Sequence, residues 1–139
     1  MRVSEIMTEA AVLDQADDTL VEAARKMWKQ QTGSLLVVDG EDLVGIITER
    51  DVLRECLYRS DRLAQIPVRE AMTKDLIIGL PHDELGYTMG VMTKNRVRHL
   101  PVMDGGKVVG MISIGDVVKA TLDETEYENR YLKEYIQGR

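Results

Sequence analysis

An internal repeat at one constant offset runs through this sequence of 139 residues. Four pairs of short segments lie 65 positions apart: Met7-Thr8 and Met72-Thr73, Asp39-Gly40 and Asp104-Gly105, Gly45-Ile46-Ile47-Thr48 and Gly110-Met111-Ile112-Ser113, and Asp51-Val52 and Asp116-Val117. Agreement at so many spaced positions indicates two copies of one structural unit, so any fold proposed for the first copy must also suit the second.

One copy has the pattern of a β-α-β-β-α unit. The elements predicted for the first copy are a strand at 11–13, a helix at 20–28, strands at 35–38 and 43–47, and a helix from 48 to about 58. Asp18-Thr19 supplies an N-cap for the first helix, and Asp39-Gly40 is a hairpin turn. The second copy begins with a strand predicted at 76–78. On the last helix of the first copy, Val52, Leu53 and Cys56 are expected to face inward.

Two such units are expected to share one body of the α+β class. A unit of about 60 residues buries too little surface to be stable alone, so the copies should pack sheet to sheet around a pseudo-two-fold axis. The predicted bounds are residues 1–60 for the first repeat, 61–67 for a linker, 68–122 for the second repeat and 123–139 for a C-terminal amphipathic helix. The apolar stripe of that helix either packs on the parent module or forms a dimer contact; its members are Tyr127, Tyr131, Leu132, Tyr135 and Ile136.

Composition excludes several classes of function. The formal net charge of −6 argues against binding to nucleic acid, because phosphate neutralisation dominates that affinity. A single cysteine, Cys56, forms no intramolecular disulfide, and the two histidines, His82 and His99, lack the clustered ligands of a metal site. The sequence has neither a signal peptide nor an apolar run of about 20 residues, so we expect a soluble cytoplasmic protein away from membranes. No nucleophile with a base is found, so we expect no enzymatic activity.

A hydroxyl three residues before a carboxylate occurs at the same place in both copies. The pairs are Thr48 with Asp51 and Ser113 with Asp116, and each follows a glycine-containing strand and opens a helix. Helix N-termini carry free N–H groups and the positive end of the dipole, which favour anions. The hydroxyl could contact a phosphate, and the carboxylate could accept hydrogen bonds from the two hydroxyls of a ribose. The alternative is a capping box that only stabilises the helix.

In combination, these motifs make the sequence resemble a tandem pair of CBS domains, also called a Bateman module. The resemblance rests on Val3-Ser4-Glu5-Ile6-Met7-Thr8, on Val68-Arg69-Glu70-Ala71-Met72-Thr73, on residues 98–104 and on the two Gly-x-x-[Thr/Ser]-x-x-Asp stretches, and covers about residues 1–122. It implies a regulatory module that binds an adenosyl ligand: AMP in the first place, or ADP, ATP, NAD or S-adenosylmethionine. It further implies that Asp51 and Asp116 bind ribose, with Thr48 and Ser113 near the phosphate. Adenine is expected against the first strand of each repeat; the residues there are Val12 and Ile77.

The two copies differ at one place that bears on the ligand. Gly33-Ser34 in the first copy corresponds to Arg98-His99 in the second, the densest cationic stretch of an acidic chain. In modules of this family, basic residues at this place reach the phosphates, so Arg98 and His99 are expected to do so for the ligand of either site.

The resemblance also implies how the module signals. It implies a disc-like homodimer, for which the helix faces around Val52, Leu53, Val117 and Val118 are candidates, and an effector protein that the sequence does not identify. The alternative function is a structural or dimerisation module without a ligand.

Overall fold

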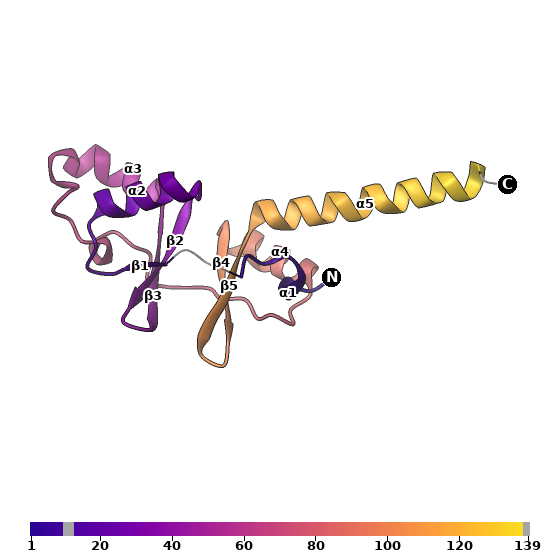
Figure 1. Ribbon diagram of the computed structural model, residues 1–139, viewed down its shortest axis with the longest axis horizontal. Coiled ribbons are helices and arrows are strands. Elements are labelled where there is room, and N and C mark those ends of the chain that lie inside the picture. Colours follow the sequence, from indigo (N-terminus) through magenta and orange to yellow (C-terminus); the bar gives the residue numbers. More distant parts are fainter. Residues whose placement is uncertain (10–12, 138–139) are drawn as a thin grey trace.

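The computed structural model describes residues 1–9 and 13–137 as two small bodies side by side, with a long helix projecting from the second (Figure 1). The elements are α1 (Val3–Ile6), β1 (Leu13–Gln15), α2 (Leu20–Gln30), β2 (Ser34–Asp39), β3 (Asp42–Thr48), α3 (Glu49–Arg59), α4 (Leu85–Asn95), β4 (His99–Asp104), β5 (Lys107–Ser113) and α5 (Ile114–Gln137). Short 3₁₀ helices at Ser60–Arg62 and Val68–Glu70 lie between the repeats. The α+β class with two similar halves and a C-terminal helix is confirmed.

The first body follows the predicted order of elements. β1 runs parallel to β2, and β3 is antiparallel to β2, giving a three-stranded sheet. α2 begins in a capping box: the Glu22 N–H donates to Thr19 Oγ1 at 3.2 Å, and the Thr19 N–H donates to the Glu22 carboxylate at 3.3 Å. Its buried side chains are Leu20, Ala23 and Met27, which recur at intervals of three and four residues as on one face of a helix.

The second body lacks the strand predicted at 76–78, and that prediction is wrong. Only Gly79 joins the sheet: its N–H donates to the Pro101 carbonyl at 2.9 Å, and its carbonyl accepts the Met103 N–H at 2.9 Å. In a parallel ladder the next donors on either side would be Pro101 and Pro81, and neither has an N–H group. The described part of this sheet therefore contains two strands, β4 and β5, paired antiparallel.

The segments that precede each repeat are exchanged between the bodies. Thr8 pairs with Met111 of β5, while Thr73 pairs with Ile46 of β3. These two pairs are related by the repeat offset, so the predicted pseudo-two-fold relation is present. The buried cores show the same exchange, because Val3 belongs to the core of the second body and Ile66, Val68 and Ala71 belong to the core of the first.

α3 places only some of its residues as predicted: Val52 packs against the first core and Cys56 is partly buried. Its buried side chains are Asp51 and Glu55, whereas Leu53 is 62% exposed. The expectation that Leu53 faces inward is therefore wrong. Glu55 tolerates burial because the Arg59 Nε donates to its carboxylate at 2.8 Å.

α5 begins in the second body and continues well beyond it. It spans Ile114–Gln137 without a break, about 36 Å at the usual rise per residue, and its end lies far from both sheets (Figure 1). Val117 is fully buried in the second core, so the expectation of an exposed face there is wrong, whereas Val118 is 46% exposed. Among the described helices, none combines the length and apolarity required to cross a bilayer.

Candidate functional site

Thr48 and Asp51 form a complete capping box at the start of α3. The Asp51 N–H donates to Thr48 Oγ1 at 3.2 Å, and the Thr48 N–H donates to Asp51 Oδ2 at 3.0 Å. The Thr48 hydroxyl also donates to Asp51 Oδ2 at 3.0 Å. The helix-capping role that the sequence left open is thus present, and one carboxylate oxygen of Asp51 already has two partners within the motif.

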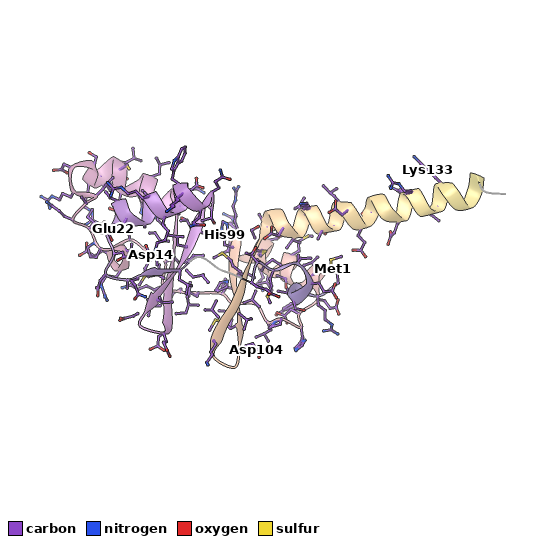
Figure 2. All side chains as sticks on the ribbon, viewed as in Figure 1. Met1, Asp14, Glu22, His99, Asp104 and Lys133 are labelled. Atoms are coloured by element: carbon purple, nitrogen blue, oxygen red, sulfur yellow. The ribbon has the colours of Figure 1, made fainter. Side chains whose placement is uncertain are left out.

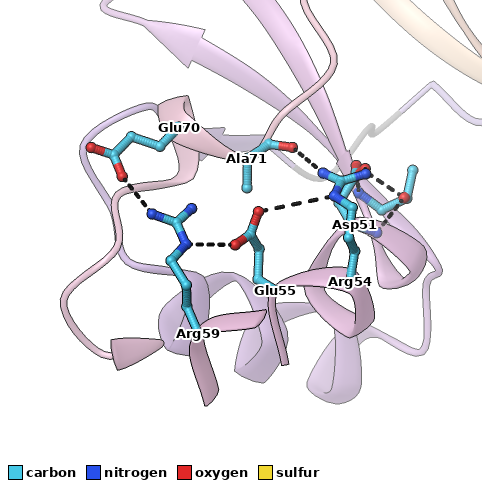
Figure 3. Close-up of polar contacts among 7 residues, drawn as sticks. Asp51, Arg54, Glu55, Arg59, Glu70 and Ala71 are labelled. Carbon is cyan, nitrogen blue, oxygen red and sulfur yellow. Dashed lines mark hydrogen bonds and ion pairs between the residues drawn. The ribbon is translucent and has the colours of Figure 1, made fainter. Parts of the chain in front are cut away.

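The other oxygen of Asp51 is held by an arginine. Arg54 Nη1 lies 3.2 Å from Asp51 Oδ1, and Arg54 Nη2 donates to the Ala71 carbonyl at 3.1 Å (Figure 3). Ala71 belongs to the lead-in segment at the start of the second repeat, so this ion pair depends on the packing of that segment. A ribose at Asp51 would have to share the carboxylate with Arg54.

A second ion-pair network lies beside the first. Arg59 contacts Glu55 and, at 3.5 Å, Glu70 of the connecting segment (Figure 3). Hydrogen bonding from Arg59 holds the pKa of Glu55 below its usual range, because it stabilises the charged carboxylate more than burial penalises it. These contacts fix the outer end of α3 against the connecting segment and leave Glu55 ionised.

Ser113 and Asp116 repeat the capping motif at the start of α5, but the Asp116 carboxylate has fewer partners than that of Asp51. The Asp116 N–H donates to Ser113 Oγ at 3.1 Å, and the Ser113 N–H donates to Asp116 Oδ2 at 3.1 Å. Lys119 stands where the first repeat has Arg54, and among the described residues Asp116 has no ion pair. The carboxylate of Asp116 therefore retains more capacity to accept hydrogen bonds than that of Asp51.

The sheet register brings the two motifs toward one junction. Thr48 pairs with Ser34 across β2 and β3, and Ser113 pairs with His99 across β4 and β5. The Ser34 hydroxyl lies 3.5 Å from the sulfur of Met111 on β5, so the pair Thr48–Ser34 of the first sheet contacts the second sheet. Figure 2 places His99 between the two sheets. Four of the predicted site residues thus share one end of the paired sheets: Thr48, Ser113, His99 and, one turn into α5, Asp116.

The electrostatics of this junction differ between its two sides. Burial lowers the pKa of His99, although the carboxylates of Asp116 and Glu49 act in the opposite direction. The neutral imidazole is therefore the main form at pH 7. The exposed Arg98 side chain has no hydrogen bond or ion pair with another described residue, and only its carbonyl is engaged, by the Ile114 N–H at 2.8 Å. Arg98 supplies the permanent positive charge near this end of the sheets.

The first repeat has an acidic group where the second is cationic. Glu49 lies against Gly33, the counterpart of Arg98, so closely that a methyl group on Gly33 would be 2.7 Å from the Glu49 carboxylate oxygen. An anion would meet repulsion there. The replacement of Gly33 by Arg98 in the second copy therefore changes the charge next to the last helix of each repeat. The charge is negative at the start of α3 and positive at the start of α5.

The predicted adenine-binding residues are less well defined. Val12 lies outside the described residues. Ile77 is half-buried and packs against the core of the second body.

A groove between α2 and α3 was not predicted from the sequence. It has a volume of about 600 Å³ and is lined by Ala24, Met27, Trp28, Gln31, Thr32, Glu49, Val52, Leu53 and Cys56. None of the predicted ligand-binding residues lines it, and it lies on the outer helical face of the first body. The apolar residues Trp28, 87% exposed, and Leu53 at its rim make it a contact surface rather than a polar ligand site. Two of its lining residues, Val52 and Leu53, belong to the helix face that the sequence suggested for a dimer contact.

Comparison with known proteins agrees with the repeat. The model of the CBS domain family matches residues 3–58 and 68–123. The mitochondrial CBS domain-containing protein CBSX3 of Arabidopsis thaliana is 39% identical over 127 residues, which are 88% of this chain. The chain spans 62% of the length of that relative.

Solved structures agree as well. A CBS-domain protein from Burkholderia ambifaria superposes with a TM-score of 0.84 at 36% identity, covering 88% of this chain and 95% of that one. The CBS domain pair of protein MJ0100, solved with 5′-methylthioadenosine and S-adenosyl-L-methionine, has a TM-score of 0.81 at 24% identity, covering 89% and 98%. At that identity the MJ0100 pair supports the fold alone.

Proposed function

The chain belongs to the CBS domain family, and from this premise we propose that it is a regulatory module that binds an adenine nucleotide, AMP in the first place, without converting it. The observation that carries the proposal is the pair Ser113 and Asp116 at the start of α5, next to His99 and Arg98. Asp116 offers a carboxylate without a competing cation among the described residues, and Arg98 offers a positive charge without a described partner. A ribose and a phosphate on one ligand would use both.

The proposal assigns unequal roles to the two motifs. Asp116 is the stronger ribose acceptor, because Asp51 must share its carboxylate with Arg54 at 3.2 Å. Thr48 and Ser113 lie near the phosphate. Which of the two ligands Arg98 serves follows from single substitutions of the two aspartates. ADP, ATP, NAD and S-adenosylmethionine are the other candidates, and all of them carry the adenosine part that the ribose contact of Asp116 would bind.

Calorimetry of AMP and adenosine against variants tests the proposal. Arg98→Ala is expected to weaken AMP at least tenfold, because a hydrogen bond to a charged group contributes about 1.5–3 kcal/mol, and to leave adenosine nearly unchanged. The double variant Asp51→Ala/Asp116→Ala should weaken both ligands. Asp123→Ala removes one exposed carboxylate further along α5 and serves as the charge-matched control for each single aspartate substitution.

Two outcomes would contradict these assignments. Equal losses for AMP and adenosine with Arg98→Ala would mean that Arg98 supports the fold rather than the phosphate. Wild-type AMP affinity in the double aspartate variant would exclude both carboxylates from ribose binding. Circular dichroism of each variant checks that removal of a cap, which costs about 1 kcal/mol, has not unfolded the chain. AMP should also bind more tightly as the pH falls through the range in which His99 gains a proton. That range lies below the usual one for histidine, because burial lowers the pKa of His99.

A structural module without a ligand is the second candidate. It is favoured by the reciprocal capping bonds, which give both aspartates a role without any ligand. A thermal shift panel of adenine compounds separates the two functions. A ligand at 100 times its dissociation constant should stabilise the fold by about 2.7 kcal/mol, and no shift with any compound would favour the structural role.

The module is further proposed to be a homodimer that signals to an effector protein in the cytoplasm. Exposed aliphatic residues on the outer helices support self-association: Leu53 and Leu57 on α3 and Val118 on α5. Light scattering should give twice the chain mass of 15.7 kDa. A single-chain mass at high micromolar concentration would exclude the homodimer.

A further inference from the structure

The outer two thirds of α5 extends beyond the second body, and none of its described side chains is buried. In this segment, residues 121–137, which we term the α5 tail, every described side chain is exposed. Leu122 is 58% exposed and Leu132 is 54% exposed, and none of the ion pairs among the described residues lies in the tail. Isolated helices of this length are marginal in water, since most helical stability in proteins comes from packing of one face. The tail therefore needs a partner.

One face of α5 has the spacing of a coiled-coil contact. Its positions, which we term the α5 seam, alternate at intervals of four and three residues: Val118, Leu122, Thr125, Asn129 and Leu132. Apolar residues at this interval form the contact line between paired helices, and a single Asn in the line fixes register and the number of strands. All five seam residues are exposed. The seam starts where α5 leaves the body, so the helix is already nucleated there.

The charges beside the seam have the matching arrangement. Glu128 and Lys133 flank the seam on opposite sides and lie five positions apart, and both are exposed. In a parallel pair of helices, residues at these two flanking positions face each other across the contact. Each helix would thus place Glu128 beside Lys133 of the other, twice per dimer, and Asn129 would face its own copy.

We propose that the α5 tail pairs with the same segment of a second copy as a short parallel two-stranded coiled coil through the α5 seam. The occupant is a second copy because the polar seam residue and the flanking charges complement themselves. The groove between α2 and α3 of the same chain is out of reach, since α5 points away from the first body (Figure 1). An antiparallel pairing would lose the pairing of Glu128 with Lys133, because residues on the same flank of the seam then face each other. The pairing is independent of nucleotide binding at Asp116.

Cysteine cross-linking of the full chain tests the contact. In a Cys56→Ser background, Asn129→Cys should form covalent dimers under mild oxidation with diamide, because equivalent residues on the seam face each other across the two-fold axis. The matched control is Arg130→Cys in the same background, one position along and on the outer side. We expect cross-linked dimer with the first variant and little with the second. Equal cross-linking of both variants, or none with Asn129→Cys, would overturn the proposal.

A charge exchange tests the parallel direction. Chains with Glu128→Lys and chains with Lys133→Glu each place like charges across the contact, but a mixture of the two restores both pairs. Mixing differently sized versions should therefore yield mainly heterodimers. A statistical mixture would exclude the parallel register.

Loss of an apolar contact in the seam distinguishes self-association through the α5 tail from self-association through other surfaces. Leu132→Lys should raise the dimer dissociation constant about tenfold or more in sedimentation equilibrium. AMP calorimetry on the same variant should be unchanged, so failure of the tail contact and failure of nucleotide binding are distinguishable. An unchanged dimer constant would assign self-association to the outer helical faces instead and overturn the role of the seam.

Discussion

Replacing Gly110 by alanine is expected to lower the free energy of unfolding by about 2–3 kcal/mol, and Gly45→Ala should do the same. A methyl group on Gly110 would lie 2.8 Å from the Thr8 carbonyl oxygen and 2.8 Å from the Met7 sulfur. The methionine could move, but the Thr8 carbonyl accepts the Met111 N–H at 3.0 Å, so displacing it breaks the bond that joins the lead-in segment of the first repeat to the sheet of the second body. Overpacking against backbone cannot relax by a change of rotamer.

Gly45 repeats this arrangement with the segments exchanged. A methyl group there would meet the Met72 sulfur at 2.5 Å and the Thr73 carbonyl oxygen at 2.9 Å. The Thr73 carbonyl is held by the Ile46 N–H at 3.0 Å. The two substitutions therefore act on symmetrical contacts, and we expect losses of similar size.

Urea unfolding followed by circular dichroism measures these effects, with α4 as an internal control. Gly86 and Gly90 lie in that helix with open space where a methyl group would be added. Gly86→Ala and Gly90→Ala should each stabilise the protein by up to about 1 kcal/mol, because glycine is a poor helix former. Equal effects of Gly110→Ala and Gly90→Ala would show that the crossing segments do not pack closely on the sheets.

The second large effect concerns a buried carboxyl in β1. Asp14 is 1% exposed, and one of its carboxylate oxygens has no hydrogen-bond partner among the described residues. Burial raises its pKa to about 6, and the neighbouring Asp18 adds to this, while Lys26 at 3.2 Å acts in the opposite direction. We expect the free energy of unfolding to fall by about 2–3 kcal/mol as pH rises from 4 to 7 because of this group alone.

The direction follows from proton binding. Between the unfolded pKa near 3.8 and the folded pKa near 6, the folded chain holds the Asp14 proton and the unfolded chain has released it. Stability therefore falls with rising pH across this window. Asp18 has a lowered pKa, chiefly through its hydrogen bond to Asp14, so its contribution changes only below about pH 4 and lies outside the window.

Urea titrations at pH 4 to 7 test this prediction. Asp14→Asn should flatten the slope of stability between pH 4 and pH 6, whereas Asp123→Asn at an exposed position should leave it unchanged. A wild-type slope in Asp14→Asn would mean that another group releases the proton. The second repeat offers a natural contrast, because Gly79 occupies the position of Asp14 there.

The repeat and its local signals predicted most of the fold. The apolar spacing of α2 and the hydroxyl–carboxylate pairs at Thr48 and Ser113 depend on neighbours three or four residues away, so the sequence specifies them directly. The absence of a strand at 76–78 was harder to predict from the sequence, because it depends on which residues would have to pair with β4. Pro81 stands in place of Ala16, whose N–H donates to the Val38 carbonyl at 2.9 Å, and this matters only once the partner strand is known.

The inward face of α3 could not be predicted for a related reason. Asp51 and Glu55 are buried because Arg54 and Arg59 reach the Ala71 carbonyl and Glu70 of the connecting segment (Figure 3). Those partners do not belong to the first repeat, which contains α3, but to the segment that follows it. At the candidate site, local spacing predicted the capping geometry. The orientation of Arg54 toward Asp51 depends on the Ala71 carbonyl, and the burial of His99 depends on packing between the elements, so neither could be derived from local spacing.

The exchange of lead-in segments also constrains how the chain matures during synthesis. The first core lacks Ile66, Val68 and Ala71 until the connecting segment has left the ribosome, so the first repeat cannot close when its own helices are complete. Val3 is buried later still, because its core neighbours in α4, β4 and β5 are synthesised after the connecting segment. The earliest residues to emerge are thus among the last to be buried. A ribosome-stalled chain ending at Arg59 should be protease-sensitive throughout. The first half should become protected once Ala71 has emerged from the ribosome, and the second half only after β5 and the start of α5 have emerged.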